Sequence, residues 1–147
     1  MSQFWNRKRI LVTGGAGFIG SEVVRNLVEK RGVPRENIVV PRSADCDLRS
    51  MEHAQRAVAG CQLVIHTAAR TGGIAYSREH PASQYFDCML MNLNVMAACT
   101  NRVEKFVGVG NILAYPETAA DAVENSRKVQ DLRAGLQEKG VQCLVGG

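Results

Sequence analysis

The stretch that decides the fold of this 147-residue chain is Thr13-Gly14-Gly15-Ala16-Gly17-Phe18-Ile19-Gly20. A short apolar run over residues 9–13 precedes its glycines, and a segment with helical spacing of apolar residues, 18–30, follows them. The run stopped by glycine predicts a buried strand, and the spacing after it predicts an amphipathic helix. Glycines in this context are typical of a loop that holds the pyrophosphate of a dinucleotide.

Each glycine of this loop has a physical task. One makes a tight turn with unusual backbone angles, one lets the backbone approach phosphates without a Cβ, and one lets the helix pack closely on the strand. The free N–H groups and the dipole at the helix start then face the phosphates. A glycine-rich turn without a ligand stays open as the alternative. A P-loop is disfavoured because no Gly-Lys-Ser or Gly-Lys-Thr follows.

Strand and helix continue to alternate along the chain. Further strands are predicted over residues 37–40, 63–65, 105–109 and 141–145, and further helices over residues 50–58, 82–101 and 118–139. Ser50 is the expected N-cap of its helix, and a glycine-containing loop is expected over residues 71–73. Alternation of this kind predicts parallel strands with right-handed helical crossovers. We expect one α/β domain over residues 1–147, a doubly wound parallel sheet of the Rossmann type with about five strands in the order 3-2-1-4-5.

The composition fits one globular domain. The hydrophobic fraction is 46% and the net charge is +4. The basic cluster Arg7-Lys8-Arg9 has no interleaved aromatic residues, so we expect a solvated segment and no nucleic-acid partner. The first apolar run is too short for a signal peptide or a membrane span, so no membrane partner is expected.

Cysteine and histidine usage favours a reduced, metal-free protein. The cysteines are Cys46, Cys61, Cys88, Cys99 and Cys143. Their odd number and the absence of C-x-x-C spacing argue against a disulfide framework and a zinc site, and favour reduced thiols in the cytoplasm. His66 and His80 have no partner at metal-ligand spacing, so both are expected to be structural and no metal site is predicted.

The residues after the second strand bear on which dinucleotide is bound. NAD binders usually carry an acidic residue there, which holds the ribose 2′-hydroxyl. This chain has Val40-Pro41-Arg42-Ser43 instead. The planar guanidinium of Arg42 suits a 2′-phosphate, so NADP(H) is favoured over NAD(H). NAD(H) binding, with Arg42 merely exposed, stays open.

The loop over residues 13–20 resembles that of the extended short-chain dehydrogenases, the NAD(P)-dependent nucleotide-sugar epimerases, dehydratases and reductases. Further segments narrow the resemblance to the GDP-L-fucose synthase branch: Pro41-Arg42-Ser43, Asp47-Leu48-Arg49, His66-Thr67-Ala68-Ala69, Gly72-Gly73-Ile74 and Ala114-Tyr115-Pro116. The resemblance covers residues 8–117 well and the remainder more loosely.

The resemblance implies a role for each matching position. Gly14, Gly15, Ala16, Gly17, Phe18, Ile19 and Gly20 are implied to wrap the pyrophosphate, and Arg42 to meet the 2′-phosphate. Asp47 and Leu48 are implied to border the adenine; for Asp47 alone, a carboxylate near a helix N-terminus is the alternative. Ala68, Ala69 and Arg70 are implied to line the ribose side of the cofactor, and residues 72–74 to lie near the sugar-nucleotide entrance.

The chain departs from the family's pattern at the catalytic positions. The family uses a serine and a Tyr-x-x-x-Lys pair to handle the proton during hydride transfer. Asn111 stands at the serine's position, and it cannot relay a hydroxyl proton. Lys128 matches the lysine, but Glu124 stands where the family has tyrosine. Glu124 or Tyr115 as a substitute acid stays open, so catalytic activity is uncertain and Lys128 with Asn111 form a degenerate site.

Family members also carry a further C-terminal stretch that builds the sugar-nucleotide pocket, and this chain is expected to lack it. Three hypotheses follow: a nucleotide-sugar epimerase or reductase, completed by unusual residues or a second polypeptide; a module that holds NADP(H) without turnover; or a remnant that folds without a selected function. A sheet ending at the fifth strand has an exposed edge, so a homodimer or a complementing chain is the expected partner besides a nucleotide-sugar substrate.

Overall fold

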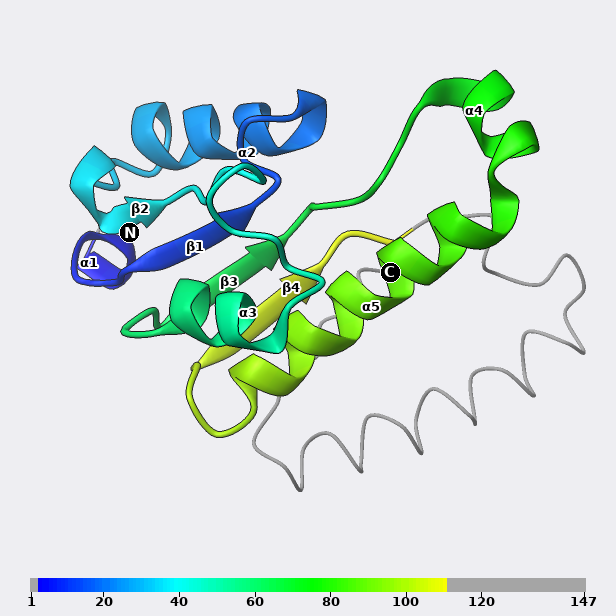
Figure 1. Ribbon diagram of the computed structural model, residues 1–147. Coiled ribbons are helices and arrows are strands. Elements are labelled where there is room, and N and C mark those ends of the chain that lie inside the picture. The colour runs from blue at the N-terminus through cyan, green and yellow to red at the C-terminus, as the bar shows by residue number, and fades with distance from the viewer. Residues whose placement is uncertain (1–2, 111–147) are drawn as a thin grey trace, which may run out of the picture.

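Four parallel strands form the centre of the structure, a computed structural model that describes residues 3–110 (Figure 1). The strands are β1 (Ile10–Thr13), β2 (Ile38–Val39), β3 (Leu63–His66) and β4 (Lys105–Gly108). Every residue of β1 and three of the four in β3 are buried. Such continuous burial is typical of parallel strands covered by helices on both faces.

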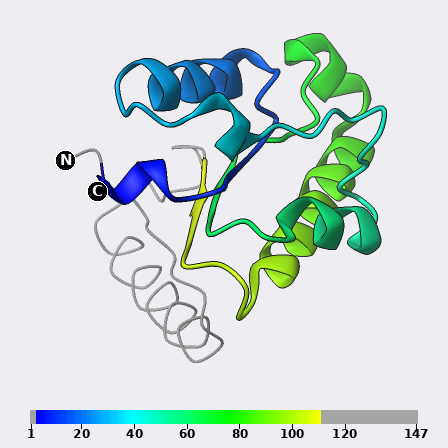
Figure 2. The same ribbon diagram turned by 90° about the vertical axis from the view of Figure 1, so that its left-hand side faces the viewer.

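Helices connect the strands and cover the two faces of the sheet. They are α1 (Gln3–Asn6), α2 (Phe18–Glu29), the 3₁₀ turn η1 (Arg35–Asn37), α3 (Met51–Val58), α4 (Gly73–Glu79) and α5 (Pro81–Cys99). Figure 2 shows α2 on one side of the sheet and α3 with α5 on the other. This two-sided cover confirms the doubly wound α/β class.

Alternating side chains of the strands supply two separate hydrophobic cores. Ile10 and Val12 of β1 pack with Leu27 of α2 on one face. Leu11 of β1 packs on the other face with residues of α3 and α5, among them Val95. Successive side chains of a strand point to opposite faces, so β1, β2 and β3 contribute to both cores. Phe106 of β4 packs in the core of α3 and α5.

Most of the predicted elements within residues 3–110 are confirmed, with ends that differ by one or two residues. Ser50 caps α3 as predicted, accepting a hydrogen bond from the His53 backbone N–H. The short helix α4 begins at Gly73, inside the predicted loop, and continues through residues for which no element was predicted. The helix predicted over residues 118–139 and the strand over 141–145 lie outside the described residues.

The predicted strand order was wrong. The sheet has the order β2-β1-β3-β4, so β3 pairs with β1 and not with β2. The reason lies in strand length. Pro41 follows close behind β2, which has only two residues, whereas β1 offers β3 a register of four residues from Ile10↔Leu63 to Thr13↔His66. The longer ladder satisfies more backbone groups and leaves the short strand at the edge.

Candidate functional site

The turn between β1 and α2 has a backbone that only glycine fits. Gly14 has a φ of +67°, and a Cβ there would lie 2.8 Å from the backbone nitrogen of Ala68. A Cβ on Gly20 would lie 2.1 Å from the Gly14 carbonyl oxygen. The Gly17 N–H donates to that same oxygen at 2.8 Å. The first position therefore supplies the left-handed turn, and Gly20 lets α2 approach the strand end.

The N-terminus of α2 opens onto this turn. Its cap residue, Gly17, makes no side-chain hydrogen bond to the first N–H groups of the helix. The first N–H groups of a helix have no partner inside it, and they carry the positive end of the helix dipole. This geometry suits an anion such as a phosphate.

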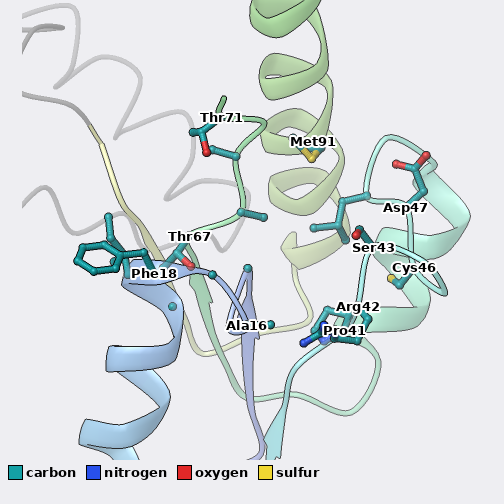
Figure 3. A pocket seen from close by; sticks show the side chains of 17 residues that line it. Ala16, Phe18, Pro41, Arg42, Ser43, Cys46, Asp47, Thr67, Thr71 and Met91 are labelled. Carbon is teal, nitrogen blue, oxygen red and sulfur yellow. The ribbon is translucent and has the colours of Figure 1, made fainter. Parts of the chain in front are cut away.

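A cleft of about 620 Å³ lies in front of this turn, at the carboxyl ends of β1, β2 and β3 (Figure 3). Its walls are the turn over residues 14–20, the segment 41–48 after β2 and the segment 67–71 after β3. From β1 the chain first moves outward to β2, then returns past β1 to β3. Parallel α/β sheets bind ligands at such a switch point, and the volume is typical of a small-molecule site.

Of the residues predicted to hold a cofactor, all except Gly15 and Arg70 line the cleft. Arg70 lies beside it, and its guanidinium pairs with Asp87. Gly15 lies behind the turn, where a Cβ would meet the Val40 side chain at 2.8 Å. The cleft brings the predicted residues together; that they hold a dinucleotide stays a prediction.

Sequence reasoning about the cofactor overlooked parts of the wall. Met91 of α5 and Cys46 both line the cleft, and Figure 3 shows Met91 between its Thr71 and Asp47 sides. Nothing in the sequence marks a methionine in an apolar helix as a wall residue, because the helix's packing direction decides it. Asn111 and Lys128, as well as Tyr115 and Glu124, lie outside the described residues.

Two charged groups of the cleft differ in how they are held. Arg42 is exposed, and no carboxylate among residues 3–110 forms an ion pair with it. Asp47 accepts hydrogen bonds from the Arg49 backbone N–H at 3.0 Å and from its guanidinium at 2.8 Å. These bonds lower the pKa of Asp47 to about 2. Among the described residues, the cleft thus offers a cation without an ion-pair partner, Arg42, and an ionised carboxylate whose charge Arg49 compensates.

A buried hydrogen-bond chain supports the cleft from below. The Thr13 hydroxyl lies 2.6 Å from His66 Nδ1, and His66 Nε2 lies 2.9 Å from the side-chain oxygen of Asn92. Because that oxygen accepts, Nε2 carries the proton and Nδ1 accepts from Thr13. Burial lowers the pKa of His66, which keeps the ring neutral. The Ala68 N–H donates to the Thr13 hydroxyl at 3.3 Å, so the chain ties the segment after β3 to β1.

The described residues hold no metal-binding group of three or more histidine, cysteine or acidic side chains. Within residues 3–110, moreover, every helix is too short or too polar to cross a membrane. His80 packs against the ring of Tyr76 at 4.7 Å between centroids. Both histidines singled out in the sequence therefore have structural contacts.

Comparison with known proteins places these features in a family. The sequence model described as the NAD dependent epimerase/dehydratase family matches residues 10–133. The chain is 27% identical over 129 residues to a GDP-L-fucose synthase of Dictyostelium discoideum, covering 86% of this chain and 40% of the relative. It is 28% identical over 147 residues to the GDP-L-fucose synthase of Escherichia coli (strain K12), covering 97% of this chain and 44% of the relative.

Solved structures agree on the fold. The structure of a GDP-L-fucose synthetase from Naegleria fowleri bound to NADP superposes with a TM-score of 0.68 at 22% identity, covering 94% of this chain and 49% of the other. The chain spans less than half the length of each of these relatives.

Proposed function

Because the chain belongs to the NAD dependent epimerase/dehydratase family, we propose that it holds NADP(H) for hydride transfer at a sugar carbon of a nucleotide sugar. The activity would be that of an oxidoreductase or isomerase of the GDP-L-fucose synthase type, as the names of the similar proteins suggest. The observation that carries the proposal is the cleft that joins the glycine turn, the N-terminus of α2 and the unpaired Arg42.

The residues of the cleft fit a dinucleotide. A Cβ added to Gly17 would have one neighbour within 4 Å, the Gly14 carbonyl oxygen at 3.2 Å. The outer side of the turn is therefore open to a ligand. The N–H groups at the start of α2 would face its pyrophosphate. The cofactor supplies the hydride; the chain's own residues bind and orient it. Residues 47–48 and 67–69 would hold the adenine and ribose sides.

The choice of NADP(H) over NAD(H) rests on Arg42. Arg42 has no ion-pair partner within residues 3–110, so its guanidinium can form charge-assisted hydrogen bonds with a 2′-phosphate. No acidic side chain follows β2 before Asp45, which does not line the cleft, and the carboxylate of Asp47 is already engaged by Arg49. A ribose 2′-hydroxyl would therefore find no free acceptor of the kind that NAD binders use.

The test is a titration of the purified chain with NADPH and with NADH, followed by nicotinamide fluorescence. We expect tight NADPH binding and weak NADH binding. Replacing Arg42→Ala should weaken NADPH binding about tenfold to a hundredfold, because a hydrogen bond to a charged group contributes about 1.5–3 kcal/mol, and should leave NADH binding unchanged. Arg102→Ala, the same charge change next to the amino end of β4, is the control. Equal NADPH affinity in all three proteins would contradict the role of Arg42.

A second candidate function is an NADP(H)-binding module without turnover. The residues that favour it are Asn111 and Glu124, which stand where the family has serine and tyrosine. Assay of GDP-sugar turnover with bound NADPH separates the two. Oxidation of NADPH that depends on the sugar nucleotide supports the enzyme, and binding without turnover, alone or with an added C-terminal polypeptide, supports the module.

We further propose that residues 1–147 form one NAD(P)-binding domain that associates with a second chain, either another copy or a complementing chain. Exposed apolar side chains along α5, namely Tyr85, Phe86 and Leu93, support such a contact. Sedimentation as a monomer at high concentration would contradict the homodimer. A cytoplasmic location is part of the proposal, supported by the free thiols of the described cysteines.

A further inference from the structure

A nearly buried carboxylate joins two loops behind the cleft. The side chain of Asp87 on α5 is only 10% exposed. It pairs with the guanidinium of Arg70, from the segment after β3, and accepts from Arg49 Nη1 at 3.3 Å, from the segment after β2. Asp87 itself does not line the cleft. A buried carboxylate is stable only when its charge is compensated, and here two arginines from different loops compensate it.

The same face of α5 reaches the cleft and the backbone of the segment after β2. Asp87, Met91 and Asn94 are four and three residues apart, so they lie on one side of the helix. Met91 lines the cleft. The Asn94 side-chain N–H groups donate to the carbonyl oxygens of Leu48 at 3.1 Å and Arg49 at 2.8 Å. We call residues 47–49 the strap. Helix α5 therefore holds the backbone of the strap through Asn94 and the Arg49 side chain of the strap through Asp87.

We infer that Asp87 is a positioning residue that fixes the strap and Arg70 relative to each other, and thereby sets the adenine side of the cleft. The inference rests on the proposed binding of NADP(H). Arg49 is the connecting side chain, since its guanidinium also engages Asp47, which lines the cleft, at 2.8 Å. A chain of charge-assisted hydrogen bonds thus runs from the cleft wall to α5 and on to the loop after β3.

The charges of the cluster make the tie specific. Two carboxylates, Asp47 and Asp87, balance two guanidiniums, Arg49 and Arg70. The hydrogen bond from the Arg70 guanidinium holds the pKa of Asp87 below its usual range, so the carboxylate is ionised at neutral pH. In the Asp87→Asn variant, Arg49 is expected to keep its ion pair with Asp47. Arg70 is expected to keep its contact with the Tyr76 ring, whose centroid lies 5.8 Å from the guanidinium carbon. The change therefore removes the charge that joins the two guanidiniums, while the backbone bonds of the strap to Asn94 and of Arg70 to Gln84 stay in place.

The test measures the affinity and the stoichiometry of NADPH binding to the full chain and its Asp87→Asn variant at low temperature. Adenosine 2′,5′-bisphosphate, titrated separately, probes the adenine side alone. We expect both ligands to bind about tenfold more weakly to the variant at unchanged stoichiometry, the equivalent of one lost orienting contact. A merely structural role would instead lower the melting temperature and the bound fraction while leaving the dissociation constant of the folded molecules unchanged.

Two further variants keep the outcome decisive. Glu104→Gln makes the same change of charge at a more exposed ion pair, that with Lys8 in the segment before β4, and should bind both ligands like the original chain. Arg49→Lys keeps the charge but loses the planar fork, and should weaken both ligands in the same direction even if Asp87→Asn fails to fold. If the dissociation constants are unchanged in both Asp87→Asn and Arg49→Lys, the inference about Asp87 is overturned and the proposed function is not affected. Failure of the unaltered chain to bind NADPH overturns the proposed function, and the inference with it.

Discussion

At the scale of single residues, the turn after β1 shows why its glycines are required. Gly14 needs a left-handed backbone, and Gly20 needs the space that a Cβ would fill. The two requirements concern the same atoms, since the Gly14 carbonyl oxygen is what a Cβ on Gly20 would strike. The turn and the first helical turn of α2 are therefore fitted to each other.

Gly20→Ala is expected to displace this turn. The added Cβ would lie 2.1 Å from the Gly14 oxygen, which is backbone and cannot rotate away. We expect a loss of about 1–3 kcal/mol in the free energy of unfolding, as for other overpacked sites, together with loss of NADPH binding. Urea denaturation and fluorescence titration measure the two effects. Gly110→Ala, where a Cβ meets nothing within 4 Å, is the control. Native-like stability of Gly20→Ala would contradict this account.

The residues that sequence could predict are those whose type is dictated by local geometry or charge. The glycines of the turn and Arg42 belong to this class, and they do line one cleft. Asp87 and Met91 could not be predicted, because their roles depend on which face α5 turns to the loops. A lone acidic residue in an apolar helix looks solvent-exposed in sequence, yet Asp87 is buried by partners 17 and 38 residues away.

At the scale of elements, β1, β3 and α5 are joined by a single buried ring. His66 at the end of β3 contacts Thr13 of β1 and Asn92 of α5, and it is 5% exposed. The helix boundaries were predictable from apolar spacing and from the Ser50 cap. The start of α4 was not, because Gly72-Gly73 is the kind of dipeptide that predicts a loop, yet the helix begins at Gly73.

This arrangement predicts a pH dependence of stability. Burial lowers the pKa of His66 below its ordinary value of 6.5. The unfolded chain therefore binds a proton that the folded chain does not, and stability falls as pH drops below 6.5 toward the folded pKa. The slope should not exceed about 1.4 kcal/mol per pH unit for one proton.

Urea denaturation between about pH 7.5 and pH 5 measures this slope above the range where most carboxylates titrate. His66→Asn, which cannot take up a proton there, is the comparison. The His66→Asn variant should be less stable at the upper pH, because Thr13 and Asn92 lose their hydrogen bonds with the imidazole ring. Its stability should also change less with pH. An equal slope in the two proteins would assign the pH dependence to other groups.

At the scale of the whole molecule, the layers were predictable and the strand order was not. Alternating strands and helices require a parallel sheet with helices on both faces. They do not fix on which side of β1 the third strand inserts. That depends on how many residues each strand can pair with β3. The strand β2 has only two residues, whereas β1 pairs with β3 over four. Boundaries of strands this short are difficult to read from sequence, so the order is too.

Ligand binding should stabilise the whole domain, because the cleft is built from segments after three different strands. A ligand at about a hundred times its dissociation constant adds about 2.7 kcal/mol, which for a chain of this size raises the melting temperature by about 5–10 °C. We expect this shift with NADPH and a smaller one with NADH at the same concentration. Thermal unfolding of Arg42→Ala with NADPH should resemble the NADH experiment. Tight binding by fluorescence without any thermal shift would contradict a site shared by the whole sheet.

The pairing of β1 with β3 also determines when the site becomes available during synthesis. The glycine turn leaves the ribosome early. The residues that support it, Ala68 next to Gly14 and His66 bonded to Thr13, come more than 50 residues later in the chain. Until β3 emerges and docks, the turn has no wall behind it, and α5 has not yet emerged to cover β3. A nascent chain is therefore expected to remain unable to capture its cofactor until β3 and α5 have both emerged.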